Sequence, residues 1–214
     1  MRSVDEKTSI QALERIQGVA PESKGLHRRR EFEYIRHGTT SLMAAVNVAK
    51  GDMVHHRLAP TRKEDDFLAF IQATVERYPK QDEVILLADQ LNTHMSVSLV
   101  EWVAGQINYK EELGTKAYKG IVKNMKTRKA FLEDESHRIR FVYTPKHCSW
   151  LNPIENWFAK LQGHVVRNGN FSSVKVLEDK IESYSSFYNR CLLKPLKWKF
   201  KGFIKAKELK NLNR

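Results

Sequence analysis

The chain has 214 residues, with 37 Lys and Arg against 25 Asp and Glu, which gives a formal net charge of +12. Apolar residues make up 41% of the chain, a share that excludes a disordered polymer and suffices for one large domain with its own core. The positive excess favours a polyanionic partner, most often nucleic acid, although a basic protein without such a partner has the same balance.

The two cysteines, Cys148 and Cys191, exclude a disulfide framework and a paired-cysteine zinc signature. No apolar segment resembles a signal peptide or reaches membrane-spanning length. We therefore expect an intracellular, cytoplasmic protein.

The hydrophobic pattern predicts strands that alternate with helices in one α/β domain with a mixed five-stranded sheet. A short first strand ends at Asp5, and an irregular basic connection covers residues 18–38. The other expected strands cover 41–49, 53–58, 84–88 and 139–143, and the helices cover 64–78, 96–106, 152–166 and 174–188. The first two of those strands form a hairpin around Lys50–Asp52, and the apolar run 84–88 indicates a central strand buried on both faces.

Two further segments are basic: an insertion at about 107–138 and a C-terminal tail at 191–214. The insertion holds six basic residues and no acid between positions 116 and 129: Lys116, Lys119, Lys123, Lys126, Arg128 and Lys129. This run is either a DNA-contacting surface or an ordinary solvated helix face, and the sequence leaves both open.

Glu155 stands at the start of a predicted helix, in the segment Cys148–Phe158. It falls three residues after Asn152, so one interpretation is a capping box in which the two residues satisfy each other's backbone amides. The other makes Glu155 a metal ligand. Nearby, Trp150, Trp157 and Phe158 are expected in the core.

Two more acids stand in distinctive places, Asp5 after the first strand and Asp89 directly after the buried one. Ligands of such sheets gather beyond the carboxyl ends of the strands. Mg²⁺ takes carboxylate oxygens, and two such ions can clamp a phosphodiester during in-line attack. Asp5, Asp89 and Glu155 are therefore candidate metal ligands.

Three blocks, Asp5–Leu13, Leu87–His94 and Tyr143–Glu155, resemble the three motif blocks of DDE transposases. The closest resemblance is to the bacterial insertion-sequence branch of the Tc/mariner superfamily, where the tail segment Lys194–Trp198 also has a counterpart. The resemblance extends over nearly the whole chain.

This resemblance implies an RNase H-like catalytic domain at residues 1–190 that binds two Mg²⁺ or Mn²⁺ ions. It implies cleavage at transposon ends and strand transfer into target DNA. The active complex would be a homodimer, located in the bacterial cytoplasm and associated with the nucleoid. By position, Asp5, Asp89 and Glu155 become the catalytic and metal-binding triad. Asn92 and His94 would orient ligands or contact DNA, and Lys146, His147 and the basic run are assigned to DNA binding.

The chain also departs from the family pattern. Asp89 and Glu155 are separated by 65 residues, roughly twice the usual spacing, and Gln90 replaces the Asn that commonly follows the second Asp. The N-terminal helix-turn-helix domain is expected to be absent. An inactive remnant that binds DNA non-specifically through its charge is therefore the alternative, and an RNase H-like nuclease with a cellular role is a third possibility.

Overall fold

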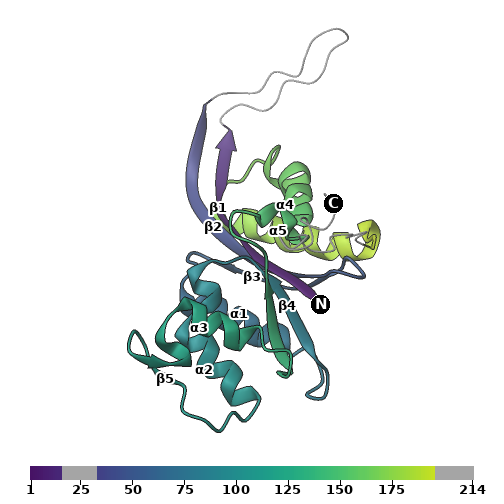
Figure 1. Ribbon diagram of the computed structural model, residues 1–214. Coiled ribbons are helices and arrows are strands. Elements are labelled where there is room, and N and C mark those ends of the chain that lie inside the picture. The colour runs from purple at the N-terminus through teal and green to yellow at the C-terminus, as the bar shows by residue number, and fades with distance from the viewer. Residues whose placement is uncertain (16–32, 196–214) are drawn as a thin grey trace, which may run out of the picture.

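The structure, a computed structural model, describes residues 1–15 and 33–195. Its centre is a mixed five-stranded sheet in the order β3-β2-β1-β4-β7. The strands are β1 (Arg2–Arg15), β2 (Tyr34–Asn47), β3 (Met53–Ala59), β4 (Val84–Ala88) and β7 (Ile139–Tyr143). β1, β2 and β3 are antiparallel neighbours, whereas β4 runs parallel to both β1 and β7. The expected α/β fold with a mixed five-stranded sheet is confirmed (Figure 1).

The first strand is much longer than expected. β1 has 14 residues and continues well past Asp5, paired with β2 down to Arg15 and Tyr34. A bulge between Lys7 and Ile10, with Ser9 at φ 55°, lets the pairing resume after the irregularity. The expectation that the strand ends at Asp5 is therefore wrong, as is the irregular connection for residues 34–38. The rest of that connection, residues 18–32, lies outside the described part of the chain.

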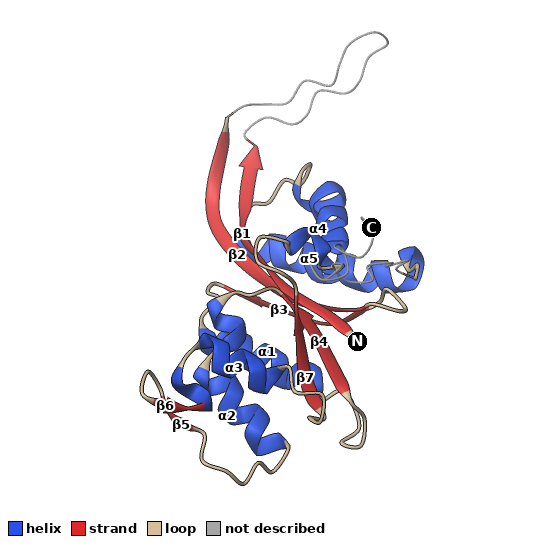
Figure 2. Ribbon diagram, in the orientation of Figure 1, coloured by secondary structure: helices blue, strands red, loops and turns tan. Residues whose placement is uncertain are grey.

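Helices cover both faces of the sheet (Figure 2). One face carries α1 (Glu64–Val75), α2 (Val97–Gln106) and α3 (Met125–Leu132), and the other carries α4 (Ile154–Leu161) and α5 (Val174–Phe187). Successive side chains of β2 point to opposite faces of the sheet and so contribute to both cores. Met43 and Ala45 pack with α1, α2 and α3, and the alternate residues Leu42, Ala44 and Val46 pack with α4 and α5.

The two C-terminal helices differ slightly from their expected bounds. α4 starts at Ile154 and continues as a π-helical turn, η4 (Gln162–Val166), and α5 continues likewise as η5 (Tyr188–Leu192). Trp157 and Phe158 are buried as expected, but Trp150 is 70% exposed. Trp150 lies in the short η3 turn (Ser149–Leu151), where Leu151 is the buried member, so its assignment to the core is wrong.

The basic insertion is folded. It forms a small hairpin of β5 (Gly114–Thr115) and β6 (Lys119–Gly120), then the turn η2 (Ile121–Lys123) and helix α3. Val122, Phe131 and Leu132 are buried in the same core as α1 and α2. This segment is therefore an integral part of one layer. Within the described residues, no helix is both long and apolar enough to span a membrane.

Candidate active site

Asp5 and Asp89 lie at the same level of two neighbouring parallel strands. Ser3 of β1 is paired with Leu87 of β4, and each acid comes two residues later on its own strand. The Asp5 side chain is on the face toward α4, because Ser3 and Asp5 share one face of β1 and Ser3 contacts the start of that helix. Glu155 lies in the first turn of α4.

Asn152 fixes the start of α4 against β1. Its Nδ2 donates to the Val4 carbonyl at 2.9 Å and to Asp5 Oδ2 at 3.2 Å, and its Oδ1 accepts from the Ser3 hydroxyl. Ser3 Oγ in turn accepts from the Ile154 amide at 2.9 Å, which satisfies one of the free amides of the helix.

The capping box between Asn152 and Glu155 is not formed. The Asn152 backbone amide donates to the Ser149 carbonyl at 2.7 Å, and no side chain of α4 makes a cap bond. A hydroxyl from a distant strand replaces it, which the local sequence does not reveal. Glu155 is thereby left exposed on the first turn of the helix.

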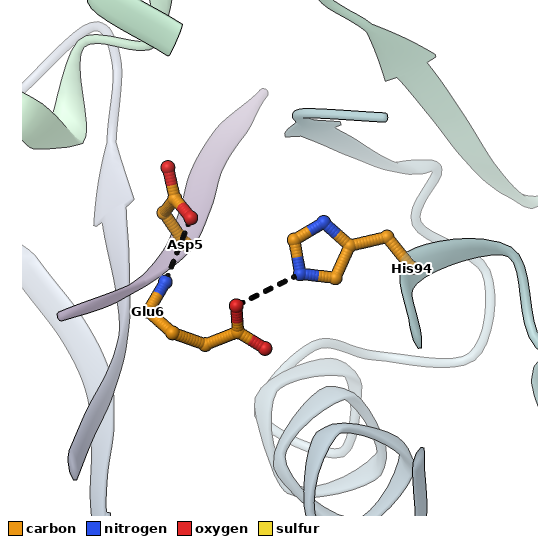
Figure 3. A group of neighbouring side chains, drawn as sticks. All are labelled: Asp5, Glu6 and His94. Carbon is orange, nitrogen blue, oxygen red and sulfur yellow. Dashed lines mark hydrogen bonds and ion pairs between the residues drawn. The ribbon is translucent and has the colours of Figure 1, made fainter. Parts of the chain in front are cut away.

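His94 lies in the turn η1 (Asn92–Met95) after β4 and is fully buried. Its Nδ1 is 2.7 Å from Asp89 Oδ1, and its Nε2 is 3.3 Å from Glu6 Oε2, as Figure 3 shows for the Glu6 pair. Phe67 of α1 stacks on the ring at 4.2 Å between centroids. The assignment of His94 to DNA contact is therefore wrong, because no face of the ring reaches solvent; its orienting role toward Asp89 agrees with this geometry.

The three acids influence one another electrostatically. Burial raises the pKa of Asp5 to about 7, with a further increase from the Asp89 charge. Partial desolvation of its carboxyl group raises the pKa of Glu155, although the residue as a whole is exposed; the charge of Lys7 acts in the opposite direction and Asp89 adds to the increase. Asp89 thus acts electrostatically on both other acids.

The His94 imidazole stabilises the negative charge of Asp89. Burial alone would raise the pKa of Asp89, but hydrogen bonding and charge from His94, with the Leu91 amide, lower it below its usual value. Burial would lower the pKa of His94, but the Asp89 and Glu6 carboxylates outweigh it and raise that pKa to about 10. Asp89 and His94 therefore form an ion pair at neutral pH.

An open hollow of about 440 Å³ lies beside Asp89. Its lining comes from the loops after β4 and β7: Asp89, Gln90, Leu91, Pro145, Lys146, His147, Cys148 and Ser149. The Gln90 amide joins the two loops by donating to the Thr144 carbonyl at 2.8 Å. Lys146 and His147 are exposed, and His147 has φ 60°, a conformation that non-glycine residues adopt rarely and that is found at functional loops. Asn92 is exposed in η1.

Some residues of the basic run form hydrogen bonds or ion pairs within the protein, and others have no acidic partner among the described residues. Arg128 donates from Nη1 to the Met95 carbonyl at 2.7 Å, so its guanidinium helps to hold α3 against η1. Lys119 is paired with Glu112 at 3.1 Å, and Lys129 is 3.7 Å from Glu133. Among the described residues, Lys116, Lys123 and Lys126 are exposed and have no acidic partner.

Sequence reasoning missed Glu6 and Ser3. Only the alternation of β1, which sends Asp5 and Glu6 to opposite faces, could have indicated that Glu6 belongs near the turn after β4. The site that results is a cluster of carboxylates at the carboxyl edge of a mixed sheet with helices on both faces. This arrangement defines the RNase H-like class of fold.

Residues 1–178 match the family described as DDE superfamily endonuclease. The match covers most of the chain, and the protein belongs to the DDE superfamily of endonucleases. A comparison with curated proteins found no match.

Several solved structures of the Mos1 mariner transposase are similar to this chain. The paired-end complex with Mn and the pre-cleavage transpososome each give a TM-score of 0.54 at 14% identity, covering 88% of this chain and 50% of the Mos1 chain. The strand transfer complex gives 0.53 at 14% identity, with 88% and 49% covered. At this identity the likeness shows the fold, and it confirms the RNase H-like class. The chain spans about half the length of the Mos1 protein.

Proposed function

We propose that this chain is the catalytic domain of a DNA transposase of the Tc/mariner superfamily, in its bacterial insertion-sequence branch. It cleaves phosphodiesters at transposon ends and transfers the cut strand into target DNA. The observation that carries this proposal is that Asp5 and Asp89 stand level on neighbouring parallel strands, while the start of α4, the helix of Glu155, is bonded to β1 beside Asp5.

The donor set fits a pair of hard divalent cations. All three side chains are carboxylates, and a buried Asp5 whose pKa is raised to about 7 is a ligand whose charge lacks compensation. Asp5, Asp89 and Glu155 would hold two Mg²⁺ or Mn²⁺ ions, and one of the similar Mos1 complexes was solved with Mn. When bound, such ions neutralise the phosphodiester and assist in-line displacement.

The protein's own residues supply position and attraction. Asn152 holds the helix of Glu155 to the strand of Asp5, so the relative placement of these two carboxylates is built into the fold. Lys146 and His147 line the hollow beside Asp89, where they would contact the DNA backbone. Asn92 and the lysines Lys116, Lys123 and Lys126, which are exposed, would add further contacts to DNA.

The paired-end and strand transfer complexes of Mos1 support DNA as the partner. We propose that the active assembly is a homodimer on transposon ends, formed in the bacterial cytoplasm at the nucleoid. Residues 1–190 form its catalytic domain and 191–214 a basic tail, of which 196–214 lies outside the described residues.

Nicking of supercoiled plasmid DNA with Mg²⁺ or Mn²⁺ tests this proposal. We expect metal-dependent nicking by the wild type and none by Asp89→Asn. Asp82→Asn is the matched control, because Asp82 is exposed before the opposite end of β4. Equal nicking by Asp89→Asn would overturn the proposal.

Steeply salt-dependent DNA binding without any cleavage would instead favour the non-catalytic remnant. Terminal inverted repeats in the flanking DNA would distinguish a mobile element from a cellular nuclease.

A further inference from the structure

A charged chain of three residues lies behind the candidate active site: Glu6, His94 and Asp89. His94 is in the middle, with Nδ1 2.7 Å from Asp89. Its Nε2 is 3.3 Å from Glu6, the pair drawn in Figure 3. The His94 side chain has no exposed surface and the Glu6 side chain is 2% exposed, whereas Asp89 is 30% exposed. The series of contacts from Glu6 through His94 to Asp89 therefore leads from the core to the open end of the site.

Burying this many ionisable groups is costly, and stability alone does not explain it. An apolar replacement of a buried ion pair is often neutral or stabilising. Here the cost is increased by Glu6 Oε1, which is buried and has no hydrogen-bond partner among the described residues. Phe67, stacked at 4.2 Å, shows that this side of the ring is otherwise apolar.

Both ring nitrogens of His94 lie close to a carboxylate oxygen, Nδ1 to Asp89 and Nε2 to Glu6. The Nε2 atom lies 3.3 Å from Glu6 without forming a hydrogen bond, so this contact is a charge interaction. Glu6 thus flanks the ring on the side away from Asp89 and restrains its position.

The contact with His94 also distinguishes the two oxygens of Asp89. Oδ1 lies 2.7 Å from His94 Nδ1 and accepts from the Leu91 amide at 3.0 Å, while no described residue donates to Oδ2. A carboxylate fixed through one oxygen presents the other in a constant direction, which is what a metal ligand needs.

We propose that Glu6 and His94 are positioning residues that fix the Asp89 carboxylate for cation binding, an inference that rests on the proposed function. Neither residue touches the DNA or the reacting atoms. Glu6 acts only through His94, and His94 only through Asp89.

The same geometry offers a competing interpretation. Asp5, Glu6 and His94 each present a ligand atom within 4.8 Å of the others, an arrangement that resembles a direct metal site. A metal on His94 Nε2 would need the lone pair of that nitrogen and would break the Glu6 ion pair. The two interpretations differ in the number of ions bound.

The test uses Glu6→Gln and His94→Asn. Glu6→Gln keeps the volume and removes the charge, and His94→Asn keeps a donor near the Nδ1 position while it removes the link to Glu6. The matched controls are Glu14→Gln and His37→Asn, which break a second Glu–His pair on the β1–β2 ribbon, 2.6 Å apart and partly exposed. Thermal unfolding verifies that each variant is folded.

Mn²⁺ binding without DNA, followed by electron paramagnetic resonance, is the first readout. We expect Glu6→Gln and His94→Asn to weaken Mn²⁺ binding about 10- to 100-fold with an unchanged number of ions, and the controls to leave it unchanged. In plasmid nicking, kcat should fall while the KM for DNA stays constant, with partial recovery at high Mn²⁺.

Two results would overturn the inference. If both folded variants bind Mn²⁺ with an affinity within twofold of wild type, the contacts between Glu6, His94 and Asp89 are only structural. If the variants bind one ion fewer than wild type, His94 and Glu6 are direct ligands. Asp89→Asn distinguishes failure of this inference from failure of the proposed function. If Asp89→Asn abolishes Mn²⁺ binding while Glu6→Gln and His94→Asn keep an affinity within twofold of wild type, only this inference fails; if Asp89→Asn also leaves Mn²⁺ binding unchanged, the proposed function fails.

Discussion

Asp5 and Asp89 stand level on two adjacent parallel strands, each two residues beyond the paired residues Ser3 and Leu87. Beyond this pair the strands separate, since β1 continues with β2 while the chain after β4 turns into η1. The two carboxylates therefore meet where the sheet opens. Burial is the main cause of the raised pKa of Asp5, and the charge of Asp89 on the neighbouring strand adds to it.

Replacing Asp5 should change how stability depends on pH in the absence of metal. The pKa of Asp5 is about 7 in the folded protein, against 3.8 ordinarily. Between these values the folded state binds more protons than the unfolded state, so this group lowers stability as pH rises from about 4 to 7. Asp5→Asn should remove that loss and gain roughly 1–3 kcal/mol relative to wild type between pH 5 and 8.

Urea denaturation in EDTA at several pH values measures this gain. Its pH dependence is the diagnostic quantity, because the amide also changes the hydrogen bonds to Asn152 and the Glu6 amide by a constant amount. A difference between variant and wild type that stays the same from pH 5 to 8 would contradict a raised pKa. Addition of Mg²⁺ should stabilise the wild type and leave Asp5→Asn nearly unaffected.

Local signals were enough to predict most of the fold. The apolar run Val84–Ala88, the hairpin turn at Lys50–Asp52 and the helix after Lys63 each carry their own periodicity or turn residues, and each is found where expected. The full length of β1 could not be predicted. Its polar residues from Lys7 to Gln11 show little alternation, and it is the antiparallel pairing with β2 that holds them in a strand.

Of the candidate site, only the acidic residues could be predicted from the sequence. Asp89 follows a recognisable strand, Glu155 stands at the start of a recognisable helix, and their motif blocks identify them. Glu6 and the Ser3 hydroxyl act through contacts to residues 88 and 151 positions away, respectively, which depend on how the chain turns after β4 and on the docking of α4. Such contacts leave no local pattern in a single sequence.

Asn152→Ala should loosen the helix that carries Glu155. The variant loses bonds to the Val4 carbonyl and Asp5, and leaves these buried groups and the Ser3 hydroxyl with fewer partners. We expect a loss of about 1–3 kcal/mol in unfolding free energy and a lower nicking rate. Asn156→Ala, an exposed position on the same helix, is the control and should change neither quantity. Equal behaviour of the two variants would show that Asn152 does not position the helix.

Truncation of two tryptophans of one motif should affect stability very differently. Trp157 is 2% exposed and contacts the rings of Phe158, Tyr184 and Tyr188, so Trp157→Ala should cost about 3–5 kcal/mol. Trp150 is 70% exposed, and Trp150→Ala should change the unfolding free energy by less than about 0.5 kcal/mol. Chemical denaturation measures both, and a large loss for Trp150→Ala would place that side chain in the core after all.

The unpaired lysines of the insertion should determine much of the salt dependence of DNA binding. Each phosphate contact contributes about 0.9 to the slope of log affinity against log salt, so a Gln triple variant of Lys116, Lys123 and Lys126 should lower the slope by roughly 2 to 3. A triple variant of Lys50, Lys80 and Lys180 removes the same charge from exposed positions, the first two of them at the opposite end of the sheet. Titration of labelled duplex DNA at several salt concentrations compares the two. Equal slopes would show that the basic run acts only through net charge, as an ordinary solvated surface does.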